Sequence, residues 1–287
     1  MRVALTDRAD AVSRRRNTRR LLGLWMPAGW LTLVALAAVL APWLPLRDPL
    51  EQDLLLMLAP PGEGHWLGSD GLGRDVLSRI VFGLRITLTV ALGSVTVGVL
   101  IGGLFGLLAG YYRGNVERWI LAANNILMAF PPLVLVLALM SYPGAALPKV
   151  ILALGLVFAS SFTRITRVNT LMFAQQSFVM AARATGMRDL RIMMREIVPN
   201  LVTPVMVYAL LMVALAAVAE GTLSFLGLSV PPPMPTLGGM IAAEVSNMHE
   251  APHAVFFPAL VFFVTIFALN RVGEYVQRSL DVRESAA

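Results

Sequence analysis

FVMAARATGMRDLRIMMREIVPN, residues 178–200, is the stretch that decides the fold. It separates two apolar segments long enough to cross a membrane, and its charges keep it out of the hydrocarbon. Its positive charges are Arg183, Arg188, Arg191 and Arg195. Gly186 permits a left-handed turn between two short helices, and Asp189 suits the N-terminus of the second. We name residues 178–200 the knuckle and expect it to dock on another molecule.

The knuckle also has an apolar face, although its arginines place it in water. The residues of this face are Ile192, Met193, Ile197 and Val198. A plain loop does not need such a face, so we expect another chain to cover it. Pro199 is expected to end the second short helix, because the residue before a proline is pushed out of the helical region.

The composition indicates a protein that crosses a membrane several times. Of the 287 residues, 57% are hydrophobic and 14% are charged, whereas soluble domains have about 25% charged residues. The mean hydropathy is +0.73. There is no cysteine, which excludes disulfides, thiol catalysis and cysteine-ligated metals. We therefore expect an all-α, polytopic membrane protein without a soluble domain.

Six apolar segments are expected to cross a hydrocarbon core of ~30 Å. They are residues 21–44, 83–110, 119–141, 149–162 with their flanks, 201–219 and 254–269. Pro131 and Pro132 are expected to kink the third segment. Arg164 and Arg167 follow the fourth segment closely, so the position of its end stays open.

The distribution of arginine predicts the orientation, because cytoplasmic segments carry an excess of Lys and Arg. Seven arginines lie in residues 1–20, two in 111–118, six in 164–200 and three in 270–287. Both termini and the knuckle are therefore expected in the cytoplasm. The predicted parts are a basic N-terminus (1–20), a first helix (21–44), an outside linker (45–82), a five-helix core (83–272) with an outside loop (220–253), and a cytoplasmic tail (273–287).

Two patterns predict contacts between helices. Glycines recur every fourth residue on one face of the second segment, where they let a neighbouring helix approach closely. They are Gly98, Gly102, Gly106 and Gly110. In the third segment, Asn124 and Asn125 are expected to make interhelical hydrogen bonds rather than to contact a substrate.

The residues before the second segment are dense in polar signals. Asp70 is expected to cap a helix, and Asp75 is expected to pair with Arg79 four residues later. This describes a well-capped interfacial helix. The same segment, which includes Arg74, is also compatible with a docking surface for an outside partner, and both interpretations stay open.

Glu220 is expected at the end of the fifth segment, shortly before Ser224. Ionisable groups near a span often mark a transport pathway, but at the membrane edge their cost falls, so pathway lining and interfacial placement both stay open. His249 and His253 are four residues apart, but Pro252 spoils the helix that a metal site would need. The chain has no phosphate-binding G-x-x-x-x-G-K-[ST] loop.

Several blocks of residues make the chain resemble a known family. Ala181-Ala182-x-x-x-Gly186-x5-Ile192, ending in Pro199-Asn200, resembles the coupling-helix signature of ABC importer permeases. Gly68-x-Asp70-x-x-Gly73-Arg74-Asp75-x-x-Ser78-Arg79 is similar to a segment of the dipeptide, oligopeptide and nickel branch. Two further segments are similar to the same branch: Glu220-x-x-Leu223-Ser224-Phe225-Leu226-Gly227-Leu228 and Asn270-x-x-Gly273. The resemblance covers about residues 21–283.

The resemblance also implies site residues. Those that couple to an ATPase are Met180, Ala181, Ala182, Arg183, Gly186, Ile192, Glu196, Pro199 and Asn200. Candidates for the pathway or for docking of a binding protein are Asp70, Arg74, Asp75, Arg79, Glu220 and Ser224. Met180 and Glu196 replace the usual Glu and His of the signature, so Arg183 and Glu196 are expected to supply a different ion pair. Leu237 stands where a Trp is common.

The mechanism that the resemblance implies needs several partners. Two homologous permeases would pair in a bacterial inner membrane, each would present a knuckle to one of two cytoplasmic ATPases, and an extracytoplasmic binding protein would deliver the substrate. ATP and Mg²⁺ would be bound by the ATPases, and this chain would hold no cofactor and perform no covalent chemistry. The implied substrates are di- and oligopeptides, with nickel or another small solute as the alternative.

Two other classes are weighed against this interpretation. A stand-alone secondary transporter or channel would need ionisable residues at mid-span for ion coupling, and the sequence places none there convincingly. An intramembrane enzyme would need a nucleophile with a base, which the sequence does not show.

Overall fold

The structure is a computed structural model that describes residues 25–62 and 64–284, so the basic segment 1–20 lies outside the described residues. The described part is built from helices joined by turns and loops, and it contains no strand beyond two isolated bridges. Its elements are a first helix (Trp25–Trp43) that ends in η1 (Ala41–Trp43), η2 (Leu54–Leu56), α2 (Val76–Tyr112), α3 (Gly114–Ala129), α4 (Pro132–Met140), α5 (Ala146–Phe173), α6 (Ser177–Ala184), α7 (Asp189–Ile192), a π-helical turn η3 (Met193–Ile197), α8 (Val198–Phe225), α9 (Leu237–Glu244), η4 (Val245–Asn247) and α10 (Pro252–Glu284). The all-α prediction is confirmed for these residues.

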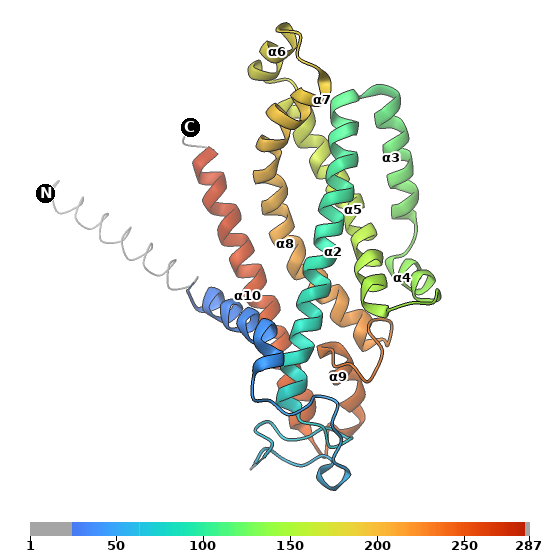
Figure 1. Ribbon diagram of the computed structural model, residues 1–287, viewed down its shortest axis with the longest axis vertical. Coiled ribbons are helices and arrows are strands. Elements are labelled where there is room, and N and C mark those ends of the chain that lie inside the picture. Colours follow the sequence, from blue (N-terminus) through green and yellow to red (C-terminus); the bar gives the residue numbers. More distant parts are fainter. Residues whose placement is uncertain (1–24, 63, 285–287) are drawn as a thin grey trace, which may run out of the picture.

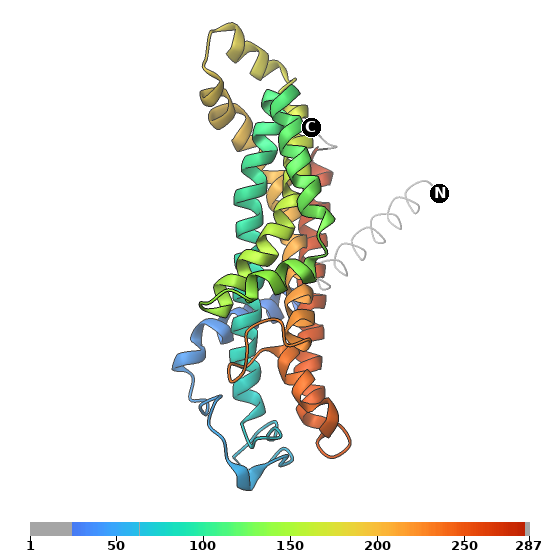
Figure 2. The same ribbon diagram turned by 90° about the vertical axis from the view of Figure 1, so that its right-hand side faces the viewer.

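The long helices lie roughly along one axis, and the two ends of the bundle differ (Figures 1 and 2). α6 and α7 project from one end, which we call the knuckle end. Residues 45–75 and α9 form the opposite end, which we call the distal end. The C-terminal part of α10 points toward the knuckle end (Figure 1). The arginine-rich knuckle is thus separated from the loop 45–75 by the length of the bundle.

The number of spans agrees with the sequence. Among the described residues, five helices are long and apolar enough to cross a membrane, and α3 with α4 makes a sixth if this bent pair counts as one span. The predicted kink at Pro131 and Pro132 is confirmed, because α3 and α4 meet at 84° across these residues. Pro132 opens α4, where its missing N–H costs no helical hydrogen bond.

Several helices continue beyond the apolar segments from which the spans were predicted. α2 begins at Val76 rather than 83, and α5 runs past Arg164 and Arg167 to Phe173. α10 runs from Pro252 to Glu284, so most of the expected tail is helical. The 37 residues of α2 have a length of ~55 Å at ~1.5 Å per residue, well beyond a ~30 Å hydrocarbon core.

α8 also corrects two predictions. Pro199 does not end the second knuckle helix, because the chain passes through η3 directly into α8, where Pro199 occupies the first turn. A proline is tolerated there because the first N–H groups of a helix have no partner within it. Glu220 does not end the fifth span, since α8 continues to Phe225. The outside loop expected at 220–253 contains α9 and η4.

The glycine face of α2 is confirmed as a helix contact. α2 and α5 run in the same direction, because Gly93 faces Ile151 while Gly110 faces Thr170. A Cβ atom added at Gly102 would overlap the carbonyl oxygen of Ala159 and lie 2.6 Å from Phe162 Cβ. The glycines therefore allow the two backbones to approach at a distance that no side chain would permit.

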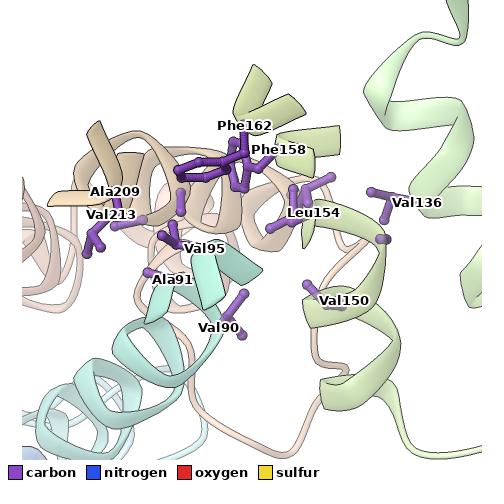
Figure 3. Packing of buried hydrophobic residues seen from close by; sticks show 14 of the residues in the cluster. Val90, Ala91, Val95, Val136, Val150, Leu154, Phe158, Phe162, Ala209 and Val213 are labelled. Carbon is purple, nitrogen blue, oxygen red and sulfur yellow. The ribbon is translucent and has the colours of Figure 1, made fainter. Parts of the chain in front are cut away.

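The main core lies where α2, α5 and α8 meet (Figure 3). Val90 and Val95 of α2, Phe158 of α5 and Val213 of α8 are buried there. Phe162 is fully buried and its ring packs edge-to-face on Tyr208, with centroids 5.2 Å apart. This cluster joins the span that precedes the knuckle, α5, to the span that follows it, α8.

Candidate functional site

The knuckle consists of two short helices on either side of a left-handed turn. α6 ends at Ala184, and Gly186 follows with φ of +79°. The Gly186 N–H donates to the Arg183 carbonyl and the Met187 N–H to the Ala182 carbonyl, a pattern that closes a helix C-terminus. Asp189 opens α7. The left-handed turn predicted at Gly186 and the acidic start predicted at Asp189 are confirmed.

The partner predicted for the apolar face of the knuckle is wrong. Ile192 and Ile197 are fully buried and Met193 is nearly so, within this single chain. They pack with Leu107 at the end of α2 and with Val179 of α6. The face therefore fixes the knuckle to its own helix bundle instead of to another chain.

A different set of apolar side chains is exposed on the knuckle. These side chains are between 37% and 67% exposed, and they are Phe178, Met180, Leu190 and Met194. Met180 was among the predicted coupling residues, whereas the other three were missed. The sequence pattern could have identified them. In a short helix with one buried apolar face, the residues on the opposite side must be exposed.

The other predicted coupling residues have mixed environments. Ala181 is exposed and Ala182 is buried. No ion pair joins Arg183 to Glu196 among the described residues, so that prediction is wrong. The Arg183 guanidinium lies over the ring of Tyr111 instead, and the Glu196 carbonyl accepts from Asn200 Nδ2 at 2.6 Å. Pro199 is exposed at the start of α8.

At the distal end, the predicted polar residues form a buried network. Asp70 Oδ2 accepts from Arg74 Nε at 2.7 Å and lies 3.3 Å from Arg79 Nε. Arg79 also donates to the Pro49 carbonyl. All three residues are at most 6% exposed. They hold residues 45–75 onto α2, so they do not form an exposed contact surface themselves.

Asp75, rather than Asp70, is the N-cap of α2. Asp75 Oδ2 accepts from the Ser78 N–H at 2.8 Å, and Asp75 Oδ1 lies 3.0 Å from His65 Nδ1. The predicted pair of Asp75 with Arg79 is therefore wrong, since Arg79 turns to Asp70. The capped helix that the sequence predicted is present, with the roles of the two aspartates exchanged.

α9 completes the distal end through contacts with the same loop. Glu244 Oε1 at the end of α9 accepts from the Gly71 N–H at 3.0 Å. Leu237, which replaces the common Trp, is fully buried beside Val76 and Ile80 of α2. Ser224 of α8 shares a hydrogen bond with Thr236, the residue that caps α9. The loop, α8 and α9 thus form one connected unit.

Glu220 is buried inside the helix bundle, against other parts of its own chain. It is 0% exposed. Glu220 Oε2 accepts from Thr87 Oγ1 of α2 at 2.7 Å, and Oε1 accepts from Ser229 Oγ at 3.2 Å. Two hydroxyl groups therefore satisfy a carboxylate that ties α8 to α2.

The asparagine prediction is confirmed for Asn125, whose Oδ1 accepts from Arg164 Nη2 of α5 at 3.0 Å. Asn124 is buried, and its side-chain amide makes a long contact with Met128 Sδ on its own helix, 4.0 Å away. Glu117 of α3 and Arg167 of α5 form a further ion pair between the same two helices.

Comparison with known proteins identifies the family. The family described as "Binding-protein-dependent transport system inner membrane component" matches residues 98–282. The glutathione transport system permease protein GsiD of Pectobacterium atrosepticum is 39% identical over 77% of this chain and 73% of its own length. The protein of the same name from Escherichia coli O6:K15:H31 is 35% identical over the same shares.

Two solved structures share the fold at low sequence identity. An inward-facing MetNI methionine ABC transporter has a chain with a TM-score of 0.54 and 17% identity, covering 69% of this chain and 96% of its own length. A chain of an amino acid ABC transporter crystallised with histidines has a TM-score of 0.53 and 16% sequence identity. The match covers 71% of this chain and 94% of that chain. With the family match and the closely similar permeases, this chain belongs to the binding-protein-dependent transport system inner-membrane components, the permeases of ABC importers.

Proposed function

We propose that this chain is one of two permease subunits of an ATP-driven importer of peptides, and that its knuckle receives the movement of a cytoplasmic ATPase. The observation that carries this proposal is the exposed apolar set on the knuckle, Phe178, Met180, Leu190 and Met194. It lies among exposed arginines at an end of the bundle far from the distal loop. Apolar side chains gathered on an exposed element mark an interaction surface.

The orientation follows from charge. The knuckle has four arginines, and Arg271 and Arg278 lie on the part of α10 that points to the same end. Because arginine accumulates on the cytoplasmic side, the knuckle end faces the cytoplasm and the distal end faces the outside. The distal loop and α9 are then available to an extracytoplasmic binding protein.

The chain is arranged to pass movement from the knuckle into the membrane. On one side the knuckle joins α5 through the short turn at residues 174–176, and on the other it continues into α8 through η3. ATP binding closes the ATPases, the knuckles move, and α5 and α8 tilt with them, exchanging an inward-open for an outward-open pathway. The ATP and Mg²⁺ of this cycle belong to the ATPases.

The peptide substrate is inferred from the relatives, which are named as glutathione transport permeases. Glutathione is a modified tripeptide, so this chemistry fits the peptide branch that the sequence motifs indicated. To test it, the complete importer is reconstituted in proteoliposomes, and uptake of labelled glutathione is measured with and without ATP inside. ATP-dependent uptake that unlabelled dipeptides compete for supports the proposal.

Other outcomes of that assay would replace the proposal. Competition by Ni²⁺ but not by peptides, together with stabilisation of the purified binding protein by Ni²⁺ alone, would assign a metal-ion substrate. Uptake that continues without ATP would indicate a secondary transporter, and the buried Glu220 of α8 would then be a candidate ion-coupling residue.

Gly186 tests the role of the knuckle separately from the substrate. A Cβ at Gly186 meets no atom within 4 Å, so a substitution acts through the backbone alone. Gly186→Val should uncouple ATP hydrolysis from uptake, because a β-branched residue disfavours φ of +79°. Gly186→Asn is the matched control, since Asn tolerates the left-handed region. Normal uptake by the Val variant would remove the coupling role from the knuckle.

A further inference from the structure

Tyr111, in the last turn of α2, contacts both halves of the knuckle. Its hydroxyl group donates to Asp189 Oδ1 at 2.7 Å, and Asp189 opens α7. Arg183, in the last turn of α6, has its Cζ 5.1 Å from the centroid of the Tyr111 ring. Tyr111 is 7% exposed. One buried side chain therefore bridges the segments on either side of the Gly186 hinge.

This contact matters because α2 has no chain connection to the knuckle. The backbone joins the knuckle to α5 and α8 only. Apart from apolar packing around Leu107 and the Arg183 contact, the Tyr111 hydroxyl makes the one hydrogen bond between α2 and residues 177–197 in the described part of the chain. Movement of the knuckle therefore reaches α2 through side-chain contacts. Among these contacts, the hydrogen bond of Tyr111 is the one with a defined geometry.

α2 is also the helix through which movement would reach the distal end. It packs on α5 along its glycine face, and Thr87 ties it to Glu220 of α8. At its far end, Asp75 caps it inside the buried network that holds residues 45–75. A displacement of α2 at Tyr111 would therefore also move the other end of α2, where residues 45–75 are attached.

We propose that Tyr111 is a positioning residue that ties both halves of the knuckle to α2, so that a push on the knuckle moves α2 together with α5 and α8. This rests on the proposed function, in which the knuckle is the place where ATPase movement enters. Tyr111 touches neither substrate nor nucleotide in this role. It acts by keeping the knuckle and α2 in one orientation.

The test uses the complete importer in proteoliposomes, with the second permease, the ATPases and the binding protein carrying the ligand it retains on purification. The quantity measured is the factor by which the binding protein stimulates ATP hydrolysis. Tyr111→Phe should lower this factor by about fivefold, the ratio that a typical net hydrogen-bond energy permits. Tyr112→Phe is the matched control, because Tyr112 is 47% exposed and its hydroxyl bonds to no described residue.

Substitutions of Asp189, which accepts the hydrogen bond from Tyr111, provide a second test. Asp189→Ala should reproduce the Tyr111→Phe defect, and the double variant should be no worse than the more severe single one, since both remove the same bond. Asp189→Asn keeps an oxygen acceptor and should stay close to the unaltered protein. If Tyr111→Phe lowers only the thermal stability or yield of the complex, with unchanged stimulation per assembled complex, the positioning role is wrong.

The two proposals fail in different ways. If Gly186→Val leaves uptake normal, the knuckle does not couple and both proposals fall. If Gly186→Val uncouples while Tyr111→Phe behaves like Tyr112→Phe, the proposed function stands and only the role of Tyr111 is overturned.

Discussion

Single residues with satisfied polar groups hold the distal half of the bundle together. Glu220 has no exposed surface and is held by the hydroxyl groups of Thr87 and Ser229. Burying a polar group is tolerated when it is hydrogen-bonded and is costly when a partner is removed. The bond from Thr87 to Glu220 is therefore expected to contribute to stability through the penalty of breaking it.

We predict that Thr87→Val destabilises the protein by about 1–3 kcal/mol, the cost of leaving a buried acceptor without its donor. Thr89→Val is the control, because Thr89 is exposed and its hydroxyl donates only to the Arg85 carbonyl of its own helix. Thermal unfolding in mild detergent measures both. Equal midpoints for the two variants would show that the Glu220 bond stabilises nothing.

The sequence predicted some of these residues and not others. Gly186 was identifiable because a glycine between two short helices permits a left-handed or tight turn, and its φ is +79°. Asp70 and Asp75 were assigned the wrong roles because both precede α2 and both are good caps. The choice between them depends on Arg79 folding back to Asp70, a tertiary contact that local spacing does not reveal.

At the scale of elements, the parallel pair of α2 and α5 forms the most extensive helix–helix contact in the described part of the chain. The glycines of α2 face α5, and a Cβ atom at Gly106 would lie 2.6 Å from Thr166 Cβ. Gly103, one position from Gly102, faces open space, where an added Cβ meets no atom within 4 Å. Substituting Gly102 tests close helix packing, whereas substituting Gly103 tests only the general effect of glycine on helix stability.

We predict that Gly102→Ala destabilises the protein by about 1–3 kcal/mol, because the new methyl group forces α2 and α5 apart. Gly103→Ala should be neutral or stabilising by up to about 1 kcal/mol, since alanine is the better helix former. Detergent stability at increasing temperature ranks the variants. A Gly103→Ala protein that is as unstable as Gly102→Ala would contradict the packing geometry.

The elements were predictable in number but not in extent. The length of an apolar segment identifies a membrane span, so the six segments could be predicted. Where a helix continues beyond the hydrocarbon, its residues are no longer apolar, and the sequence does not show where it ends. α2 reaches Val76 because Asp75 caps it and because Leu237 of α9 covers its distal turns. Similarly, the apolar face with Ile192 and Ile197 predicted burial, but periodicity does not say which surface provides it.

At the scale of the whole molecule, the two ends have different chemistry. The knuckle end presents arginines and the exposed apolar set, whereas the distal end buries Asp70, Arg74 and Arg79 between residues 45–75 and α2. This polarity along the bundle axis suits a protein that receives movement on one side of a membrane and meets its partner on the other.

We predict the orientation of the chain from this polarity. The protein has no cysteine, so single cysteines can be introduced without background. In intact spheroplasts, a membrane-impermeant maleimide should label Leu55→Cys, where Leu55 is 95% exposed on the distal loop. Arg188→Cys on the knuckle should be labelled only after the membrane is opened. The reverse pattern would place the knuckle outside and remove its access to ATP-driven partners.

The most direct test of the central claim is site-specific photo-crosslinking of the assembled importer in its own membrane. A photoreactive amino acid replaces Leu190 on the knuckle, which is 67% exposed, or Leu55 on the distal loop. We predict that the Leu190 position crosslinks to the ATPase subunit and that the Leu55 position does not. A Leu190 probe that is exposed and reactive but never captures the ATPase, or an ATPase adduct at Leu55, would contradict the account.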